Sequence, residues 1–254
     1  MNIVTDISAW KKFRKSIRGK TIGFVPTMGN LHEGHLSLCR HAKIETEVTV
    51  VSIFVNPHQF NKKLDFNLYL HSQNLKQDQI LLESAGVDAL FLPTTAMIYP
   101  DNYEIQVCET IDSTILEGEF RPGHFSGVLT VVLKLLNLIM PTHAYFGEKD
   151  YQQYLLIEKM VRSLFLPVKI IPCETVRAPD GVACSSRNSR LNSLQRKQAA
   201  TFANILQTGR DPDQIKIKLK QLGFTVEYVA DRWKRRLAAI QLDNIRLIDN
   251  IKIN

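Results

Sequence analysis

The sequence lacks long apolar runs and paired cysteines, and each absence excludes a class of protein. No apolar run approaches the roughly 18 residues that a membrane-spanning helix needs, and the N-terminus does not have the charged-then-apolar layout of a secretion signal. The four cysteines lie far apart without a C-x-x-C pair, so neither a zinc knuckle nor a dithiol redox centre is indicated. We therefore expect a cytoplasmic protein with free thiols and no membrane partner.

The composition is that of an ordinary folded protein with a surplus of basic residues. Apolar residues make up 44% and charged residues 22% of the 254 positions, which fits one large or two modest globular domains. The formal charge of +7 favours an anionic partner, which could be nucleic acid, a membrane surface or a small phosphorylated ligand. The densest basic cluster, residues 232–236, is too short to indicate a nucleic-acid site, and we expect it to be a solvated face.

Apolar, β-branched runs alternate with stretches of helical period, which is typical of a parallel sheet wrapped by helices. After about Val176 the elements become shorter and are separated by polar turns. We therefore predict an α/β protein with a Rossmann-like, doubly wound parallel sheet in residues 1–175 and a small C-terminal α+β domain in residues 176–254. The predicted strands cover residues 21–25, 47–55, 89–92, 144–146, 168–171, 225–229 and 237–242, and the predicted helices cover 68–85, 125–140 and 152–164, with a further helix starting at Asp211.

The most informative segment is PTMGNLHEGH, residues 26–35, which lies between the first predicted strand and a helix that runs to about Lys43. Ligands of open α/β sheets bind at the carboxyl ends of strands, and a helix N-terminus presents free N–H groups to anions. His32 and His35 would lie on one side of the first helical turn, where both could donate hydrogen bonds to phosphate oxygens, and Gly34 leaves room for close approach. The segment therefore predicts a phosphate cradle.

Other interpretations of this segment fit less well. A metalloprotease motif needs histidines four residues apart, and these are three apart. A phosphate-binding P-loop would need glycine where Arg14 stands, and no G-x-G-x-x-G occurs. Two surface histidines at a helix start would be the preferred interpretation of the motif alone, so the other segments decide.

Three further segments carry polar groups. Asn56 and Gln59 follow the second predicted strand and could present amides to a polar substrate, although an Asn-Pro turn is the simpler interpretation. The segment FGEKDYQQ, residues 146–153, again follows a strand. Lys149 could bind a phosphate and Asp150 could bind ribose hydroxyls, and Gln153, one turn further on, would point into the same pocket. Cys184-Ser185-Ser186-Arg187-Asn188 could close over a triphosphate. A charged turn and a plain loop are the alternatives for the last two.

Together and in this order, the four segments resemble the pantothenate synthetase (pantoate–β-alanine ligase) family of the HIGH-type nucleotidyltransferase superfamily. The resemblance extends from about Lys20 to Asn250 and includes LEG-x-x-RPGHF-x-GV over residues 116–128 and RLIDN over residues 246–250. It implies a ligase of pantothenate biosynthesis that forms pantoyl adenylate and pyrophosphate from ATP and pantoate. β-Alanine would then attack the adenylate to give pantothenate and AMP. It also implies a homodimer, Mg²⁺ bridging the nucleotide phosphates, no protein-bound metal site and no nucleic-acid partner.

The resemblance assigns roles to residues at matching positions. The catalytic residues would be His35, His32, Lys149 and Arg187, with His35 as a proton donor. Gln59 and Gln153 would bind pantoate, and Gln59 would also lie near β-alanine. The ATP-binding residues would be Met28, Gly29, Asn30, Leu31, His32, Glu33, Gly34, His35, Gly147, Glu148, Lys149, Asp150, Val176, Cys184, Ser185, Ser186 and Arg187.

Some positions depart from the family pattern. His58 replaces a usual methionine, residues 69–72 replace Y-P-R-T, Cys184 replaces methionine or leucine, and the loop of residues 61–64 lacks an acidic residue. These changes lie beside the expected substrate pocket and its loop, so we expect them to affect substrate affinity more than reaction class.

Two other functions remain open at this point. An adenylyltransferase would use the same H-x-G-H box but keep AMP on its product. A nucleic-acid-binding module would fit the basic charge and would show steep salt dependence, although the sequence has no basic-aromatic interleaving for base stacking.

Overall fold

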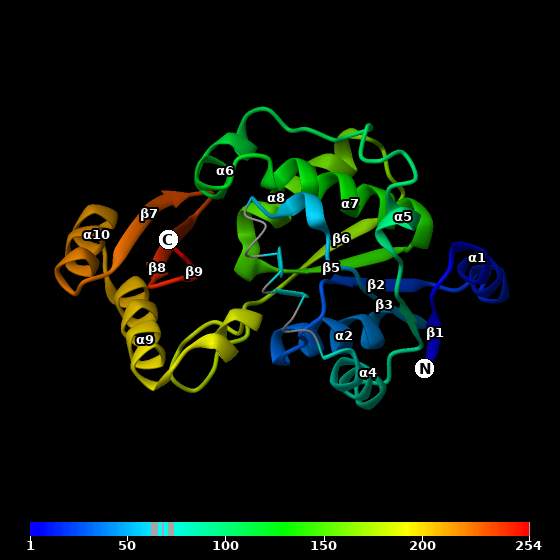
Figure 1. Cartoon of the computed structure of the whole chain (residues 1–254), viewed down its shortest axis with the longest axis horizontal. Helices are drawn as coiled ribbons and strands as arrows, with labels where there is room; N and C mark the ends of the chain where they lie inside the picture. The colour runs from blue at the N-terminus through cyan, green and yellow to red at the C-terminus, as the bar shows by residue number, and fades with distance from the viewer. Residues whose placement is uncertain (62–65, 68, 71–73, 254) are drawn as a thin grey trace. The chain divides into compact units, whose positions relative to one another are not determined.

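The computed structural model describes residues 1–61, 66–67, 69–70 and 74–253, and the chain divides into two compact units (Figure 1). The N-terminal unit comprises Met1–Gly147 and Gln152–Cys173. The C-terminal unit comprises Glu148–Tyr151 and Glu174–Asn254. The division near residue 174 lies close to the change of texture at Val176, whereas the grouping of the short segment 148–151 with the C-terminal unit was not expected from the sequence.

The N-terminal unit is built on a six-stranded parallel sheet in the order β1-β4-β3-β2-β5-β6. Helices α2 and α4 lie on one side of this sheet and α7 on the other (Figure 1). The expectation of a doubly wound α/β fold is therefore confirmed. The strands are β1 Asn2–Val4, β2 Ile22–Thr27, β3 Val48–Ile53, β4 Ala89–Phe91, β5 His143–Gly147 and β6 Lys169–Cys173.

The helices of this unit start and stop where local chemistry dictates. Helix α7 ends at Ile139 and is followed by Met140 in a left-handed conformation, just before Pro141. Helix α4 begins after Asn74, whose side chain accepts from the backbone N–H of Gln77. The predicted start of the latter helix at Leu68 lies outside the described residues. The helices are α1 Ile7–Ser16, α2 Glu33–Glu45, α4 Leu75–Ser84, α5 Thr95–Ile98, α6 Glu117–Phe120, α7 His124–Ile139 and α8 Tyr151–Ser163, with short 3₁₀ turns η1 Pro57–Gln59 and η2 Asp112–Thr114.

Strand β1 and helix α1 were not predicted. Asp6 caps α1 by accepting a hydrogen bond from the N–H of Ala9 at 2.7 Å, and Trp10 is almost fully buried against Phe91, with ring centroids 5.5 Å apart. A single buried aromatic on a short helix rich in lysine and arginine is a weak periodic signal. A three-residue edge strand is too short to show an alternation.

The C-terminal unit is a small α+β domain, as expected. Its three antiparallel strands are β7 Thr225–Arg232, β8 Arg235–Leu242 and β9 Ile245–Lys252, in the order β7-β8-β9. Helices α9 Ser193–Thr208 and α10 Pro212–Gln221 pack on the sheet through a core that includes Phe202, Leu206, Leu219 and Ile240. Asp211 caps α10 as predicted, because its carboxylate accepts from the N–H of Gln214 at 2.8 Å. The remaining elements are the 3₁₀ turns η3 Glu148–Asp150 and η4 Ser186–Arg190.

The expectation that residues 232–236 form a solvated face is wrong for two of its arginines. Trp233 and Lys234 make the tight turn between β7 and β8 with positive φ angles of 53° and 56°. Arg235 and Arg236 begin the central strand of the sheet and are only 5% and 4% exposed. The Arg235 guanidinium is paired with the carboxylate of Glu148, and that of Arg236 with the carboxylate of Asp231.

None of the helices in the described part of the chain is long and apolar enough to cross a membrane.

Candidate functional site

The loop between β2 and α2 contains two consecutive residues with positive φ angles. Gly29 and Asn30 have positive φ angles of 83° and 53°, which reverse the chain directly before the histidine box. The carboxylate of Asp78, on α4, accepts from the N–H groups of Asn30 at 2.9 Å and Leu31 at 2.8 Å. Burial raises the pKa of Asp78, while these two backbone donors oppose the rise. The Asp78 carboxylate therefore fixes the backbone of the loop at Asn30 and Leu31.

Sequence reasoning missed Asp78. It is 3% exposed and shares the buried face of α4 with Leu82, one helical turn later. A lone carboxylate on the apolar face of a predicted helix was the available signal, because a buried acid needs a partner.

The two histidines of the box are arranged by the backbone of their own helix start. His32 caps α2, its Nδ1 accepts from the N–H of Gly34 at 3.1 Å, and the Nδ1 of His35 accepts from the N–H of His32 at 3.4 Å. The two rings lie 4.0 Å apart between centroids. Because both Nδ1 atoms accept, we assign the neutral tautomer with hydrogen on Nε2 to each ring. Both imidazoles are therefore Nε2–H donors, which suits an anionic ligand.

Met28 and Gln59 come together in the N-terminal unit. The Nε2 atom of Gln59 lies 2.9 Å from the sulfur of Met28, and its Oε1 accepts from Asn56 Nδ2 at 3.2 Å. Asn56 is itself fixed, because its Nδ2 also donates to the carbonyl of Gly127 and its Oδ1 accepts from the Tyr99 hydroxyl at 2.7 Å. The Gln59 amide therefore turns its donor end toward Met28.

The close approach of α7 to this turn depends on Gly127. A Cβ atom at this position would lie 2.3 Å from the carbonyl oxygen of His58, well inside contact distance. The glycine of the G-V pair that ends the segment of residues 116–128 is therefore explained by helix packing.

His58, which departs from the family pattern, and Tyr69, which keeps the tyrosine of Y-P-R-T, have defined surroundings. The His58 ring stacks on Tyr103 at 3.7 Å with an interplanar angle of 4°, and burial lowers its pKa. The Tyr69 hydroxyl donates to the Gly29 carbonyl at 3.0 Å, so this residue contacts the β2–α2 loop. The other departures at residues 62–64, 71 and 72 lie outside the described residues.

The remaining candidates of the N-terminal unit differ in what their side chains do. Glu33 is ion-paired with Arg40, and both side chains are about half exposed. Gly147 ends β5, and apart from Gly147 and its two chain neighbours no atom of the described residues lies within 4 Å of where its Cβ would be. Gln153 is half-buried in the first turn of α8.

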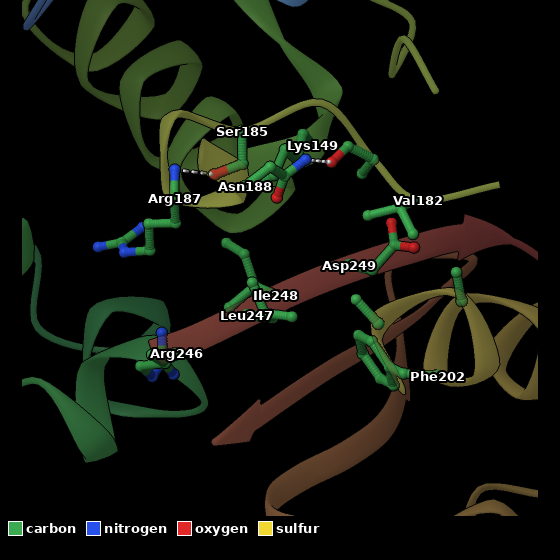
Figure 2. Close-up of a pocket in the computed structure, with 13 residues that line it drawn as sticks. Lys149, Val182, Ser185, Arg187, Asn188, Phe202, Arg246, Leu247, Ile248 and Asp249 are labelled. Atoms are coloured by element: carbon green, nitrogen blue, oxygen red, sulfur yellow. Dashed lines mark hydrogen bonds between the residues drawn. The ribbon is translucent and has the colours of Figure 1, made fainter. Parts of the chain in front are cut away.

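The C-terminal unit brings three predicted residues into one pocket. Lys149, Ser185 and Arg187 line it together with Asn188 and with strand β9 (Figure 2). Figure 2 shows Arg187 and Arg246 on one side of the view and Val182 and Phe202 on the other, so the lining combines basic and apolar groups. The complete lining is Lys149, Val182, Ala183, Ser185, Arg187, Asn188, Ala199, Phe202, Ala203, Arg246, Leu247, Ile248 and Asp249.

The loop that carries Ser185 and Arg187 is a short hairpin with a capped end. Cys184 donates its backbone N–H to the Val176 carbonyl at 2.9 Å, so these two candidates face each other across the hairpin. Ser185 caps η4, its hydroxyl oxygen accepting from the N–H of Arg187 at 3.2 Å, and Ser186 begins that turn. Glu148 and Asp150 flank Lys149 in η3 and are not among the lining residues.

A partly buried ion pair that the sequence did not reveal anchors this hairpin. The guanidinium of Arg177 donates to both carboxylate oxygens of Asp249, at 2.7 and 2.9 Å, and to the carbonyls of Gly181 and Asn250. Such a bidentate pair fixes geometry as well as charge. The match of the RLIDN segment was the only sequence signal, and it assigned no role to Asp249.

Comparison with known proteins identifies the family of the chain. The family model described as Pantoate-beta-alanine ligase matches residues 2–252. The pantothenate synthetase of Legionella pneumophila (strain Lens) is 47% identical over 98% of this chain and 99% of its own length. That of Coxiella burnetii (strain Dugway 5J108-111) is also 47% identical, over 98% and 96% of the two chains.

Solved structures agree over nearly the whole chain. The pantoate-beta-alanine ligase of Francisella tularensis, complexed with beta-gamma ATP and beta-alanine, has a TM-score of 0.94 and 42% identity, covering 99% of this chain and 97% of that one. The pantothenate synthetase of Thermus thermophilus has a TM-score of 0.90 and 37% identity, with 99% of each chain covered. The chain belongs to the pantoate–β-alanine ligase family, as its four ordered segments predict.

Proposed function

We propose that this chain condenses pantoate with β-alanine at the expense of ATP, through pantoyl adenylate, and releases AMP and pyrophosphate. The observation that carries the proposal is the paired His32 and His35 at the start of α2, with both Nδ1 atoms accepting backbone hydrogens. Two Nε2–H donors at a helix start after a parallel strand suit a polyphosphate. The names of the chain's relatives support the substrates, as do the beta-gamma ATP and beta-alanine complexed with the Francisella protein.

In the first step, a carboxylate oxygen of pantoate attacks the α-phosphorus of ATP, and the bond from that phosphorus to the bridging oxygen breaks. Negative charge grows on the departing pyrophosphate. We assign its stabilisation to His32, His35, Lys149 and Arg187, whose donors and cations require no covalent intermediate with the protein. Positioning of the two reactants supplies the rest of the acceleration.

In the second step, the neutral amine of β-alanine attacks the acyl carbon of the adenylate. The carbon–oxygen bond to AMP breaks, the nitrogen loses a proton, and pantothenate is formed. We assign Gln59 and Gln153 to pantoate, with Gln59 also next to β-alanine. We also assign Met28 to the adenosine, Gly147 and Asp150 to the ribose, and the other predicted ATP-binding positions to ATP without a finer role.

We propose that Mg²⁺ enters with ATP rather than residing in the protein. In the described part of the chain, no three His, Cys, Asp or Glu side chains gather at one place. Mg²⁺ commonly takes substrate phosphates and water as ligands. The ion would thus neutralise phosphate charge while the protein side chains bind the remaining oxygens.

The test is an assay with ATP, Mg²⁺, pantoate and β-alanine, with each component omitted in turn. We expect AMP, pyrophosphate and pantothenate in equal amounts only when all four are present. Without β-alanine, we expect pyrophosphate equal to the amount of enzyme, because the adenylate stays bound. ADP as the product, or no turnover by folded protein that binds ATP, would refute the proposal, and AMP retained on the product would indicate an adenylyltransferase.

We also propose a homodimer, as the family resemblance implies. Light scattering coupled to size-exclusion chromatography should give about twice the chain mass of 29.0 kDa.

A further inference from the structure

The turn that presents Lys149 is held by residues about a hundred positions later in the sequence. Asn250, at the end of β9, donates through Nδ2 to the carbonyl oxygens of both Glu148 and Lys149, each at 2.9 Å. Asn250 is 2% exposed, so both bonds are shielded from water. Lysine is a flexible point charge, and its ammonium can be aimed only if its backbone is held. These two bonds hold that backbone.

The orientation of the Asn250 amide is fixed in turn by Arg235. The Oδ1 atom of Asn250 accepts from Arg235 Nη1 at 2.8 Å. A flipped amide would place its oxygen against two carbonyls and its nitrogen against a guanidinium. The flip is therefore excluded while Arg235 is in place.

Arg235 also contacts the turn directly. Its Nη2 atom lies 2.6 Å from a carboxylate oxygen of Glu148, and its guanidinium lies over the Tyr151 ring, 4.2 Å from the centroid. The planar guanidinium of Arg235 thus contacts Asn250, Glu148 and Tyr151 at once, and a lysine ammonium could not make these three contacts at the same time. All of these residues belong to the C-terminal unit.

We propose that Asn250 and Arg235 are positioning residues that aim Lys149 at the phosphates of ATP. Neither Asn250 nor Arg235 lines the pocket that contains Lys149, whereas the four residues of β9 directly before Asn250 do. They would therefore act on the reaction through Lys149 and not by touching the nucleotide. This inference rests on the proposed function, which assigns Lys149 to phosphate.

The chain offers a matched control for Arg235. Arg236 is its neighbour on β8, is equally buried, and forms a bidentate pair with Asp231 at 2.8 and 2.9 Å. It also donates to the carbonyls of Gly209 and Arg210, and none of these partners belongs to the turn. Arg235→Lys and Arg236→Lys should therefore lower thermal stability alike and differ only in their effect on Lys149.

The experiment measures pyrophosphate release in a single turnover at saturating ATP and pantoate. We expect Arg235→Lys and Asn250→Ala to slow this step by roughly 10–100-fold, the size expected when a catalytic group is displaced by about an ångström. We expect Arg236→Lys to stay within about twofold of the wild type. Equal slowing by both arginine variants would overturn the inference, because it would indicate a general loss of stability.

A double-mutant cycle with Lys149→Ala distinguishes aiming from direct contact. If Asn250 acts through Lys149, Asn250→Ala should add less than about twofold to the loss already caused by Lys149→Ala. A full additive loss would overturn the inference. If Asn250→Ala does not fold, the same cycle with Arg235→Lys gives the same two outcomes. A wild-type enzyme that releases no pyrophosphate would instead refute the proposed function.

Discussion

The β2–α2 loop and the η3 turn both carry candidate phosphate-binding groups directly after a parallel strand, yet they are stabilised differently. In the loop, His32 and His35 are oriented by backbone atoms within three residues, and Asp78 supports the turn before them. In the turn, the support of Lys149 comes from Asn250, 101 residues later. The orientation of the two imidazole rings is therefore set by nearby backbone atoms, whereas the backbone of Lys149 depends on correct folding of the C-terminal sheet.

The largest effect should come from the locally stabilised site. His35→Ala removes one Nε2–H donor and should reduce adenylation by roughly 10²–10³-fold, as for loss of one transition-state donor. The fold should remain, because the hydrogen bond lost is a long one to the backbone of the same turn. His41→Ala, on the exposed side of the same helix, is the control and should leave pyrophosphate release unchanged. Near-normal turnover of His35→Ala would remove His35 from the mechanism.

The next prediction compares Lys149 with Gln153, one helical turn further along the chain. Lys149→Ala should weaken ATP binding and slow adenylation by about 10²-fold, since it removes a charge from the developing pyrophosphate. Gln153→Ala should chiefly raise the KM for pantoate. Isothermal titration with ATP in the absence of pantoate separates the two. Equal losses of ATP affinity would contradict this division of roles.

A smaller effect should follow from loosening the loop. The carboxylate of Asp78 accepts hydrogen bonds from two backbone N–H groups, and in Asp78→Asn the amide NH₂ would face one of them. That buried N–H group then has no acceptor, which costs about 1–3 kcal/mol. We expect a lower urea midpoint and an adenylation rate reduced by roughly tenfold, because the His32–His35 box follows directly on the loosened turn. Unchanged kinetics with reduced stability would show that the box keeps its geometry without Asp78.

The smallest effect should come from Glu33, which lies within the box but pairs with Arg40 on the surface. Exposed ion pairs contribute about 0–1 kcal/mol, so Glu33→Gln should barely change stability. The KM for ATP should stay within about twofold of the wild type, since the backbone N–H is retained. A tenfold rise in KM would show that the carboxylate itself takes part in nucleotide binding.

The sequence was sufficient wherever structure follows from short-range pattern. Strands β2 and β3 are mostly apolar and almost entirely buried, and the cap at Asp211 involves a neighbour three positions away. Strand β9 escaped prediction because its buried positions include Asp249 and Asn250, which read as a polar segment. The burial of Arg235 and Arg236 was misjudged because their partners are distant in the sequence or lie across a turn, and a local charge count cannot show such partners.

The most direct test of the central claim follows the oxygen atoms of pantoate. Pantoate labelled with ¹⁸O in its carboxylate is turned over with ATP and β-alanine, and the nucleotide product is analysed by mass spectrometry. We predict AMP that carries one ¹⁸O, because the carboxylate oxygen that attacks the α-phosphorus stays on it when the amine displaces the acyl group. AMP without label, or ADP with ¹⁸O in inorganic phosphate, would contradict the pantoyl-adenylate route.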